Sequence, residues 1–395
     1  MPPTTFVPTT VAELRDAVAG SVTSHPRLLV TAAGTAATTG GRPDPADAVV
    51  DTTALSGVLN YTPADMTVAV RAGTPLADVQ AELGEHGQHV AFDAARVRRG
   101  ATVGGLLATG DGGPLRQMYG TLRDLVIGVT VVLGDGTVAK AGGHVIKNVA
   151  GYDLAKLFHG SLGTLGVVAE VVLRLHPLPR TAVTVALPAD AAAATRLGVE
   201  LIASGTEPAA LEWTSGTGLL VRIEGTPDGV RERVDAVLAT NTAAHVLAGA
   251  DEEAAWTAVA AVADPVAPTT TVLRAGTLPS DGPAFLATLG AAADAAGVTL
   301  ACGSSVGVGV HTVALTGGGH APVLAAAHAA GGSSVSVLRD SGLADDVSRW
   351  GPPPPAVALM RAVKARFDPA DRFGAGRLSP WLAPTRSRDA EGVPA

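Results

Sequence analysis

Hydrophobic and polar positions alternate most regularly in the first half of the chain. From Val167 to Leu175, apolar side chains take every second position, with Glu170 and Arg174 between them, which predicts a half-buried strand. Residues 125–133 are almost continuously apolar, as in a fully buried strand, and a Gly-Asp-Gly turn leads into a second arm at 137–140. With another strand expected at 67–71, these segments predict a sheet in this half.

The pattern changes at residue 181. Short strands and Ala-rich helices then follow one another to residue 340, in the order strand, helix, strand, strand, helix, strand, and this order occurs twice. It predicts two ferredoxin-like units. The expected strands are 181–187, 209–213, 219–224, 245–247, 270–276, 298–303, 308–315 and 334–338, and the expected helices are 190–204, 228–239, 282–296 and 321–330.

Prolines at 352–355 predict a stiff linker, and a last helix over 357–367 is expected to return to the first half. The predicted organisation is therefore a first domain over residues 1–180, a second over 181–350 and a C-terminal segment over 351–395.

Four loops rich in glycine and other small residues stand beside strand ends in the first domain, at 31–40, 100–105, 109–114 and 160–166. A single loop of this kind is either a tightly packed turn or a phosphate cradle, in which consecutive N–H groups converge on an anion. Four together indicate a long ligand that lies across several backbone turns. The glycines at 160, 163 and 166 are not a dinucleotide fingerprint, because that motif follows a strand and opens a helix, whereas this loop does the reverse.

Composition narrows the class of protein. Apolar residues make up 47% of the chain and charged residues 16%, with a net charge of -8 and scattered Lys and Arg, which argues against a nucleic-acid partner. No apolar run approaches the roughly 18 residues of a membrane span, and the N-terminus lacks a secretory signal, so we expect a cytoplasmic protein. Cys302 is the single cysteine, which excludes internal disulfides and any iron–sulfur cluster held by this chain alone.

Several segments carry a family resemblance in their order along the chain. They read TPADMTVAVRAGTPLADVQAELGEHGQ, GATVGGLLATGDGGP, YGTLRDLVIGVTVVLGDG and KNVAGYDLAKLFHGSLGTLGVVAEVVLRLHP, and the closing residues read FDP and FGAGR. Together they resemble the vanillyl-alcohol-oxidase (p-cresol-methylhydroxylase-type) FAD-binding family, and within it the FAD-binding subunit of bacterial glycolate oxidase. The resemblance implies an α+β fold, in which an FAD-binding domain of two α/β subdomains carries a ferredoxin-like double βαββαβ cap.

The resemblance also implies FAD as the cofactor. At the first loop the family is close to RGGGT, whereas Thr31-Ala32-Ala33-Gly34-Thr35 keeps one glycine; alanines can still present N–H groups. No histidine occupies a recognisable flavin-attachment position, so we expect non-covalent FAD. The residues expected to bind it are Thr31, Ala32, Ala33, Gly34, Thr35, Ala36, Gly40, Ala101, Thr102, Gly104, Gly105, Thr109, Gly112, Gly120, Lys147, Gly163, Thr164, Gly166, Val167 and Val168.

The chemistry is less evident than the cofactor. Flavin oxidation of a 2-hydroxy acid requires a cation for the carboxylate and a base or metal near the hydroxyl. Catalytic relatives carry clustered histidines with a carboxylate in the cap, whereas the histidines of this cap are isolated in sequence, so no metal site is predicted; they are His245, His311, His320 and His328. The candidate cations are Lys147, Arg274 and Arg377, no catalytic residue is assigned, and Cys302 is expected to be a small core residue.

Two functions remain open. The first is an FAD-binding oxidoreductase subunit of a multi-subunit glycolate (D-2-hydroxy acid) oxidase or dehydrogenase, working beside an iron–sulfur subunit and a second flavin subunit. The second is a structural or assembly subunit that keeps the FAD fold without catalysis of its own. A reductase of nucleotide-sugar precursors with the same fold ranks last, because its serine and glutamate pattern is absent. The sequence does not specify the electron acceptor or which 2-hydroxy acid is the substrate.

Overall fold

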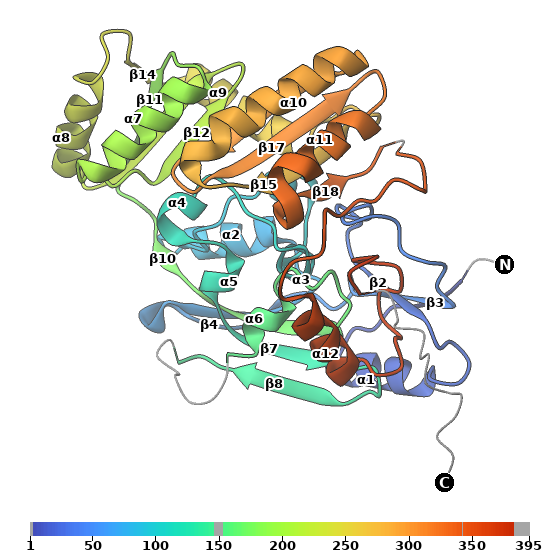
Figure 1. The fold of residues 1–395 in the computed structure, drawn as a ribbon. Coiled ribbons are helices and arrows are strands. Elements are labelled where there is room, and N and C mark those ends of the chain that lie inside the picture. The colour runs from blue at the N-terminus through green and yellow to red at the C-terminus, as the bar shows by residue number, and fades with distance from the viewer. Residues whose placement is uncertain (1–2, 146–152, 342, 383–395) are drawn as a thin grey trace.

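The computed structural model describes residues 3–145, 153–341 and 343–382. The first part of the chain contains a small parallel sheet and a larger antiparallel one (Figure 1). The three-stranded parallel sheet has the order β1-β3-β2, with β1 (Thr4–Phe6), β2 (Leu28–Thr31) and β3 (Ala48–Asp51). Helix α1 (Val11–Gly20) begins where the Thr10 side chain accepts a hydrogen bond from the N–H of Glu13.

The five-stranded antiparallel sheet has the order β4-β5-β9-β7-β8. The predicted alternation holds in its central strand β9 (Val167–Arg174), where Val171 and Leu173 are buried and Glu170 and Arg174 are only partly so. The other strands are β4 (Val58–Thr62), β5 (Thr67–Arg71), β7 (Val126–Val132) and β8 (Val138–Gly142), and β6 (Gln88–His89) pairs separately with β10 (His176–Pro177).

Short helices connect these strands and cover the five-stranded sheet. Apolar side chains of the sheet and of α2, α3, α5 and α6 form one buried cluster, and a second cluster joins α1 to both sheets. The helices are η1 (Pro63–Asp65), α2 (Leu76–Gly84), η2 (Ala95–Arg99), α3 (Val103–Thr109), α4 (Arg116–Tyr119), α5 (Leu122–Leu125) and α6 (Ala155–Phe158).

The cap is an eight-stranded antiparallel sheet with the order β14-β11-β13-β12-β16-β17-β15-β18. Its chain order is βαββαβ twice, as the sequence predicts, and the two units join edge to edge through β12 and β16. The strands are β11 (Thr181–Leu187), β12 (Ala210–Thr214), β13 (Gly218–Gly225), β14 (His245–Leu247), β15 (Thr271–Gly276), β16 (Thr299–Ser305), β17 (Val310–Thr316) and β18 (Ser336–Arg339).

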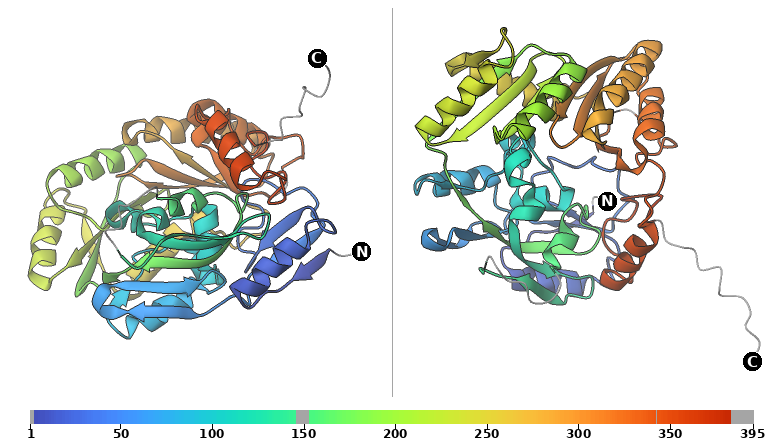
Figure 2. Two further views of the ribbon diagram at one scale, coloured as in Figure 1. Left: turned by 90° about the horizontal axis from the view of Figure 1, so that it is seen from below. Right: turned by 60° about the vertical axis from the view of Figure 1, so that its left-hand side comes forward.

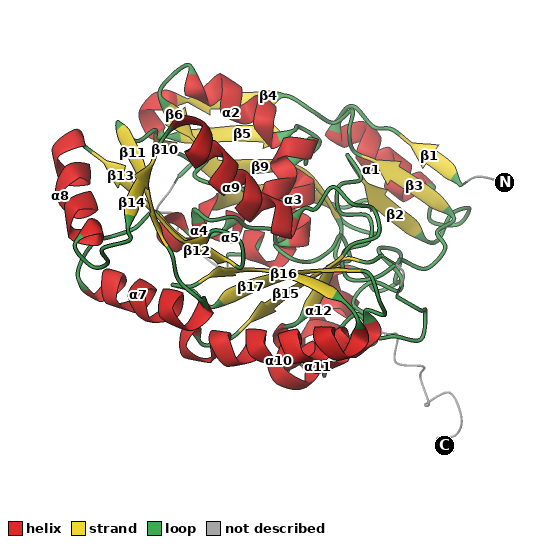
Figure 3. Cartoon of the chain, turned by 90° about the horizontal axis from the view of Figure 1, so that it is seen from above, coloured by secondary structure: helices red, strands yellow, loops and turns green. Residues whose placement is uncertain are grey.

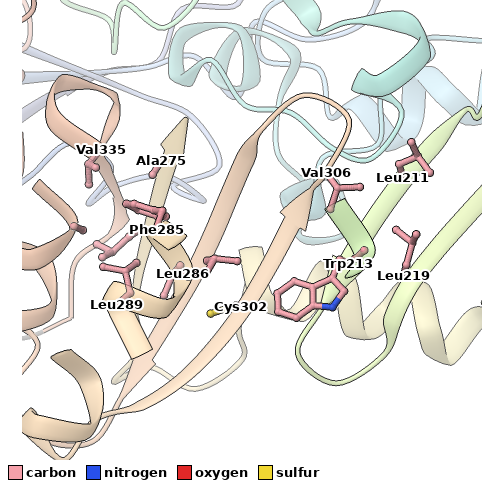
Figure 4. Packing of buried hydrophobic residues seen from close by; sticks show 14 of the residues in the cluster. Leu211, Trp213, Leu219, Ala275, Phe285, Leu286, Leu289, Cys302, Val306 and Val335 are labelled. Carbon is pink, nitrogen blue, oxygen red and sulfur yellow. The ribbon is translucent and has the colours of Figure 1, made fainter. Parts of the chain in front are cut away.

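Four helices pack on the outer face of the cap sheet (Figures 1 and 3). Trp213 and Cys302 belong to the core between sheet and helices, as do Leu286 and Leu289 (Figure 4). Cys302 is 4% exposed, which agrees with the predicted core role. The helices are α7 (Ala191–Ala203), α8 (Pro227–Leu238), α10 (Gly282–Ala296) and α11 (Ala321–Gly331), with short η3 (Pro279–Asp281) and η4 (Gly332–Ser334).

A fifth cap helix, α9 (Gly249–Ala263), was not predicted. It lies on the opposite face of the cap sheet, toward the first part of the chain (Figure 3), where it contacts β12, β16, β17 and η2. Its sequence is rich in alanine and has no separate apolar and polar faces, so it carries no helical periodicity. This helix places part of the cap directly against η2 of the first part of the chain.

The C-terminal helix α12 (Val357–Phe367) occupies the expected residues and lies against the first part of the chain (Figure 2). Its Lys364 is 9% exposed, and the Nζ atom donates to the carbonyl oxygens of Thr164, at 2.9 Å, and of Phe373, at 3.0 Å. Nζ also forms ion pairs with Asp368, at 2.5 Å, and with Asp371, at 2.9 Å. The helix is therefore fixed to the glycine loop at 160–166.

Arg372 and Phe373, just after α12, join the end of the chain to its beginning. The guanidinium of Arg372 donates to the carbonyl oxygens of Val18 and Gly134 and to the hydroxyl of Ser21. Phe373 is fully buried and pairs with Leu28 in an isolated bridge. Among the described residues, no helix is both long and apolar enough to cross a bilayer.

Candidate active site

Three adjoining cavities run from the glycine loops to the underside of the cap. The first, of about 310 Å³, lies among the predicted loops after β2, at the start of α3 and before β9, with Arg377 at its wall. No described residue accepts a hydrogen bond from the backbone N–H groups of residues 32–36, the segment that follows β2. Consecutive free N–H groups of this kind form a cradle for an anion such as a pyrophosphate.

The glycines of this cavity leave room for a ligand. Gly34 and Gly163 have φ angles of 69° and 73°, in the left-handed region that side chains rarely adopt. A Cβ at Gly34 would meet no atom within 4 Å, and one at Gly163 would meet only the Cβ of Val30, at 3.8 Å. Since such a Cβ would project into open space beside the free N–H groups, the loop geometry fits a long anionic cofactor whose backbone contacts are close.

Most of the residues predicted to bind the cofactor line this cavity or the next one. They are Thr31, Ala32, Ala33, Gly34, Thr35, Ala36, Thr102, Gly104, Gly105, Thr109, Gly112, Gly163, Gly166 and Val168. Arg377 also lines the first cavity, where it donates to the carbonyl oxygens of Thr39 and Ala37 and so supports the cradle loop.

Five predicted residues lie elsewhere, and Lys147 lies outside the described residues. Ala101 and Val167 are buried core positions. A Cβ at Gly40 would meet the ring of Trp350 at 2.7 Å, and one at Gly120 would meet the carboxylate of Asp124 at 2.5 Å, so both glycines are explained by close packing. The fifth, Thr164, hydrogen-bonds within its own loop, to the carbonyl of Ser161.

The second cavity, of about 210 Å³, contains a concentration of arginine. It shares Gly34, Thr35 and Ala37 with the first cavity and lies between the cradle loop and the cap. Two of its arginines form ion pairs, Arg96 with Asp111 at 2.8 Å and Arg99 with Asp264 at 2.5 Å. The remaining three have no carboxylate partner among the described residues; they are Arg116, Arg274 and Arg339.

Arg274 carries positive charge from the cap into this cavity. It extends from β15, and its Nη1 donates to the carbonyl oxygen of Gly110, at 2.9 Å, in the third glycine loop. Burial lowers its pKa, so the desolvated guanidinium would gain from an anionic partner. Of the two predicted cations that the structure describes, Arg274 and Arg377, Arg274 is the one that lines the cavity between cradle loop and cap.

The third cavity, of about 370 Å³, shares Gly112, Arg116, Ala263 and Thr312 with the second and continues under the cap sheet to Trp256 of α9. Two carboxylic acids line it. Glu212 is 5% exposed, and its Oε1 accepts a hydrogen bond from Ser305 at 2.6 Å; burial raises its pKa to about 7. Asp93 is more exposed than Glu212; it opens onto the cavity and accepts from the N–H of Leu115, and partial desolvation there raises its pKa.

Sequence reasoning named Arg274 but missed the other charged residues of these cavities. Among the missed residues, Glu212 left a signal, because it interrupts an otherwise apolar strand between Leu211 and Trp213. The cap histidines do not converge: His311 lies between the hydroxyls of Ser304 and Thr277, each at 2.8 Å, and burial lowers its pKa to about 4. No group of three or more His, Cys, Asp or Glu placed to hold a metal occurs in the described part of the chain.

Comparison with known proteins supplies the class of cofactor. Residues 2–142 match a family model described as FAD binding domain. The chain carries an FAD-binding domain. FAD is accordingly its cofactor, and most residues that line the first cavity belong to the matched region.

The FAD-binding domain has relatives among oxidoreductases. Glycolate oxidase subunit GlcE of Escherichia coli (strain K12) is 40% identical over 128 residues, which are 32% of this chain and 37% of that protein. Glycolate oxidase subunit GlcD of Bacillus subtilis (strain 168) is 35% identical over 185 residues, 47% of this chain and 39% of that protein. The match thus spans well under half of each of these relatives. An uncharacterized FAD-linked oxidoreductase of Mycobacterium tuberculosis (strain ATCC 25618 / H37Rv), Rv2280, is 28% identical over 382 residues, 82% of this chain and 79% of that protein.

The whole fold has a solved counterpart. A structure of alkyldihydroxyacetonephosphate synthase superposes with a TM-score of 0.67 at 16% identity, covering 94% of this chain and 75% of that one. The expected fold, an FAD-binding domain with a double βαββαβ cap, is confirmed.

Proposed function

We propose that this protein is the FAD-binding oxidoreductase subunit of a multi-subunit assembly that oxidises glycolate or a related small D-2-hydroxy acid. The observation that carries the proposal is the arginine-lined cavity between cradle and cap, where Arg116 and Arg274 have no carboxylate partner among the described residues. Two relatives that share the FAD-binding region are named glycolate oxidase subunits.

In this proposal FAD lies non-covalently along the first cavity, with its phosphates at the free N–H groups of residues 32–36. Bound FAD supplies the capacity to accept two electrons from the substrate carbon. The protein holds the substrate carboxylate on the guanidinium of Arg274, with Arg116 beside it, because a planar guanidinium can hold a carboxylate with two parallel hydrogen bonds. The cap sheet and α9 cover the substrate and keep bulk water out.

The decisive experiment is anaerobic flavin reduction. The purified chain should lose its oxidised-flavin absorbance when glycolate or D-lactate is added, alone or after addition of its partner subunits. Arg274→Gln should keep the full flavin content but weaken substrate binding about ten- to a hundred-fold, the equivalent of about 1.5–3 kcal/mol for a buried charge-assisted contact. Arg15→Gln, at an exposed position on α1, is the matched control. Unchanged substrate affinity in Arg274→Gln would refute this assignment.

The assembly belongs to the same proposal. A single cysteine cannot hold an iron–sulfur cluster, so any cluster that takes electrons from this flavin belongs to another chain. Because two relatives are named glycolate oxidase subunits, we infer an iron–sulfur subunit and a second flavin subunit as partners. The interface with these subunits should bury on the order of 1,600 Å² or more of accessible surface in total. A fully active monomer purified from native cells would contradict the assembly.

The alternative is a structural subunit that binds FAD without oxidising substrate itself. It is favoured by the scattered cap histidines, which supply no site for the metal expected in catalytic relatives. In that case the flavin of the isolated chain stays oxidised with every 2-hydroxy acid, and in the complete assembly Arg274→Gln leaves the rate of flavin reduction unchanged.

A further inference from the structure

We propose that Glu212 is the catalytic group that accepts the proton of the substrate hydroxyl; this inference rests on the proposed function. Glu212 lies in β12, at the middle of the cap sheet, and lines the third cavity together with Arg116, which also lines the arginine cavity. An anion held by Arg116 therefore lies where the arginine cavity meets the third cavity. The Glu212 carboxyl group is on the wall of the third cavity.

Elimination among the cavity walls leads to the same residue. No described histidine lines any of the three cavities. Asp111 and Asp264 already form ion pairs with Arg96 and Arg99, at 2.8 Å and 2.5 Å.

Two carboxyl groups then remain, and their surroundings differ. Asp93 accepts the backbone N–H of Leu115 at 3.0 Å, and a Cβ at Gly113 would stand 2.3 Å from its Oδ1, so it fixes a turn of the FAD-binding domain. Glu212 has one hydrogen-bond partner among the described residues, the hydroxyl of Ser305, which leaves Oε2 without one.

The charges around Glu212 set its protonation. Burial raises its pKa to about 7, and the nearby Asp93 carboxylate adds to this, whereas the Ser305 hydrogen bond and the Arg116 charge lower it. The other charged groups lining the same cavity are Arg98 and Arg222. A carboxyl group that titrates near neutral pH suits a general base, since it is partly ionised and still binds a proton firmly.

In the proposed step the hydroxyl O–H bond breaks, and its proton goes to a carboxylate oxygen of Glu212. The hydrogen on the carbon that bears the hydroxyl leaves with the electron pair of its C–H bond and goes to oxidised FAD. The products are the 2-oxo acid and reduced flavin. Glu212 later releases the proton to water. Ser305 is a positioning residue, because its hydroxyl fixes Oε1 and leaves Oε2 for the substrate.

The first test is the pH dependence of anaerobic flavin reduction in the FAD-loaded protein with its partners present. In the wild type the rate should rise about tenfold per pH unit below pH 7 and level off above it, because only ionised Glu212 accepts the proton. Glu212→Gln should lose this dependence and react about 10²- to 10⁴-fold more slowly, the range for a missing general base. Glu212→Asp should retain the rising limb at a reduced rate. Glu200→Gln, at an exposed position on α7, is the control.

The second test does not depend on turnover. Oxalate, which the flavin cannot oxidise, should bind through the arginines, and its charge should raise the pKa of Glu212. Calorimetry at pH 7.5 in two buffers of different ionisation enthalpy should then show proton uptake by the wild type and none by Glu212→Gln. Flavin content and thermal stability at pH 8 should not fall in this variant, because glutamine carries no charge into the buried site.

The outcomes separate the two proposals. If 2-hydroxy acids reduce the wild-type flavin but Glu212→Gln keeps its pH profile and rate, the assignment of Glu212 is wrong and the proposed function stands. Equal proton uptake by the wild type and Glu212→Gln on oxalate binding would also overturn the assignment of Glu212. If no 2-hydroxy acid reduces the wild-type flavin, the proposed function falls and the role of Glu212 falls with it.

Discussion

Replacing Lys364 by methionine should destabilise the protein and loosen its flavin. The ammonium group is buried among the carboxylates of Asp368 and Asp371 and the carbonyls of Thr164 and Phe373. Methionine fills a similar volume but leaves Asp368, which is 2% exposed, without its cation. Removing one partner of a buried ion pair typically costs about 3–5 kcal/mol.

The expected shift in melting temperature follows from chain length. An unfolding entropy of about 2.1 cal/mol/K per residue gives about 0.8 kcal/mol/K for 395 residues, so the loss corresponds to about 4–6 °C if the chain melts in one transition. Because Lys364 also holds the Thr164 carbonyl in the loop at 160–166, the variant should release FAD at lower temperature than the wild type.

The assay is differential scanning calorimetry together with flavin fluorescence during heating. Arg366→Met removes an exposed cation from the same helix and should shift the melting temperature by about 1 °C or less. If Lys364→Met melted within about 1 °C of the wild type, the buried ion pair would not stabilise the protein as argued.

Three further results are expected. Gly163→Leu should lose FAD, because its left-handed backbone faces the cavity, whereas Gly84→Leu, on the open side of α2, should keep it; equal flavin content in the purified proteins would contradict the loop assignment. Cys302 should resist iodoacetamide at pH 8 until the protein unfolds, since burial raises its pKa to about 12, and fast labelling of the native protein would refute this. A chelator should leave flavin reduction unchanged, because the described residues provide no metal site, and loss of activity on chelation would contradict the proposed mechanism.

The fold could be predicted from the sequence wherever burial alternates along one element. The cap strands and the outer cap helices follow this rule, because one face of each meets the core. Helix α9 does not, since it lies between the cap sheet and the FAD-binding domain and its alanines surround the helix. An element that contacts protein on several sides has no single apolar stripe to detect.

The candidate site could be predicted only in part, for a related reason. The cradle loop is a local feature, and its small residues stand next to each other in the sequence. The arginine cavity combines residues as distant as Arg96 and Arg339 from loops and strands of both domains. Glu212 was not predicted as a site residue. Alternation along β12 sets it on the face opposite Leu211 and Trp213, but whether that face meets the FAD-binding domain depends on how the cap docks.

Arg372 is near the end of the chain, so it becomes available for folding only late in translation. Its guanidinium satisfies carbonyl groups of Val18 and Gly134, and Phe373 fills the core beside Leu28. The nucleotide-binding half is therefore translated long before the residues that complete its packing. The cap strands and helices up to β18 contact one another, so they can fold before translation of the chain ends. The flavin site should form last, after translation has passed α12, so the nascent chain holds an open and unfinished cradle for most of its synthesis.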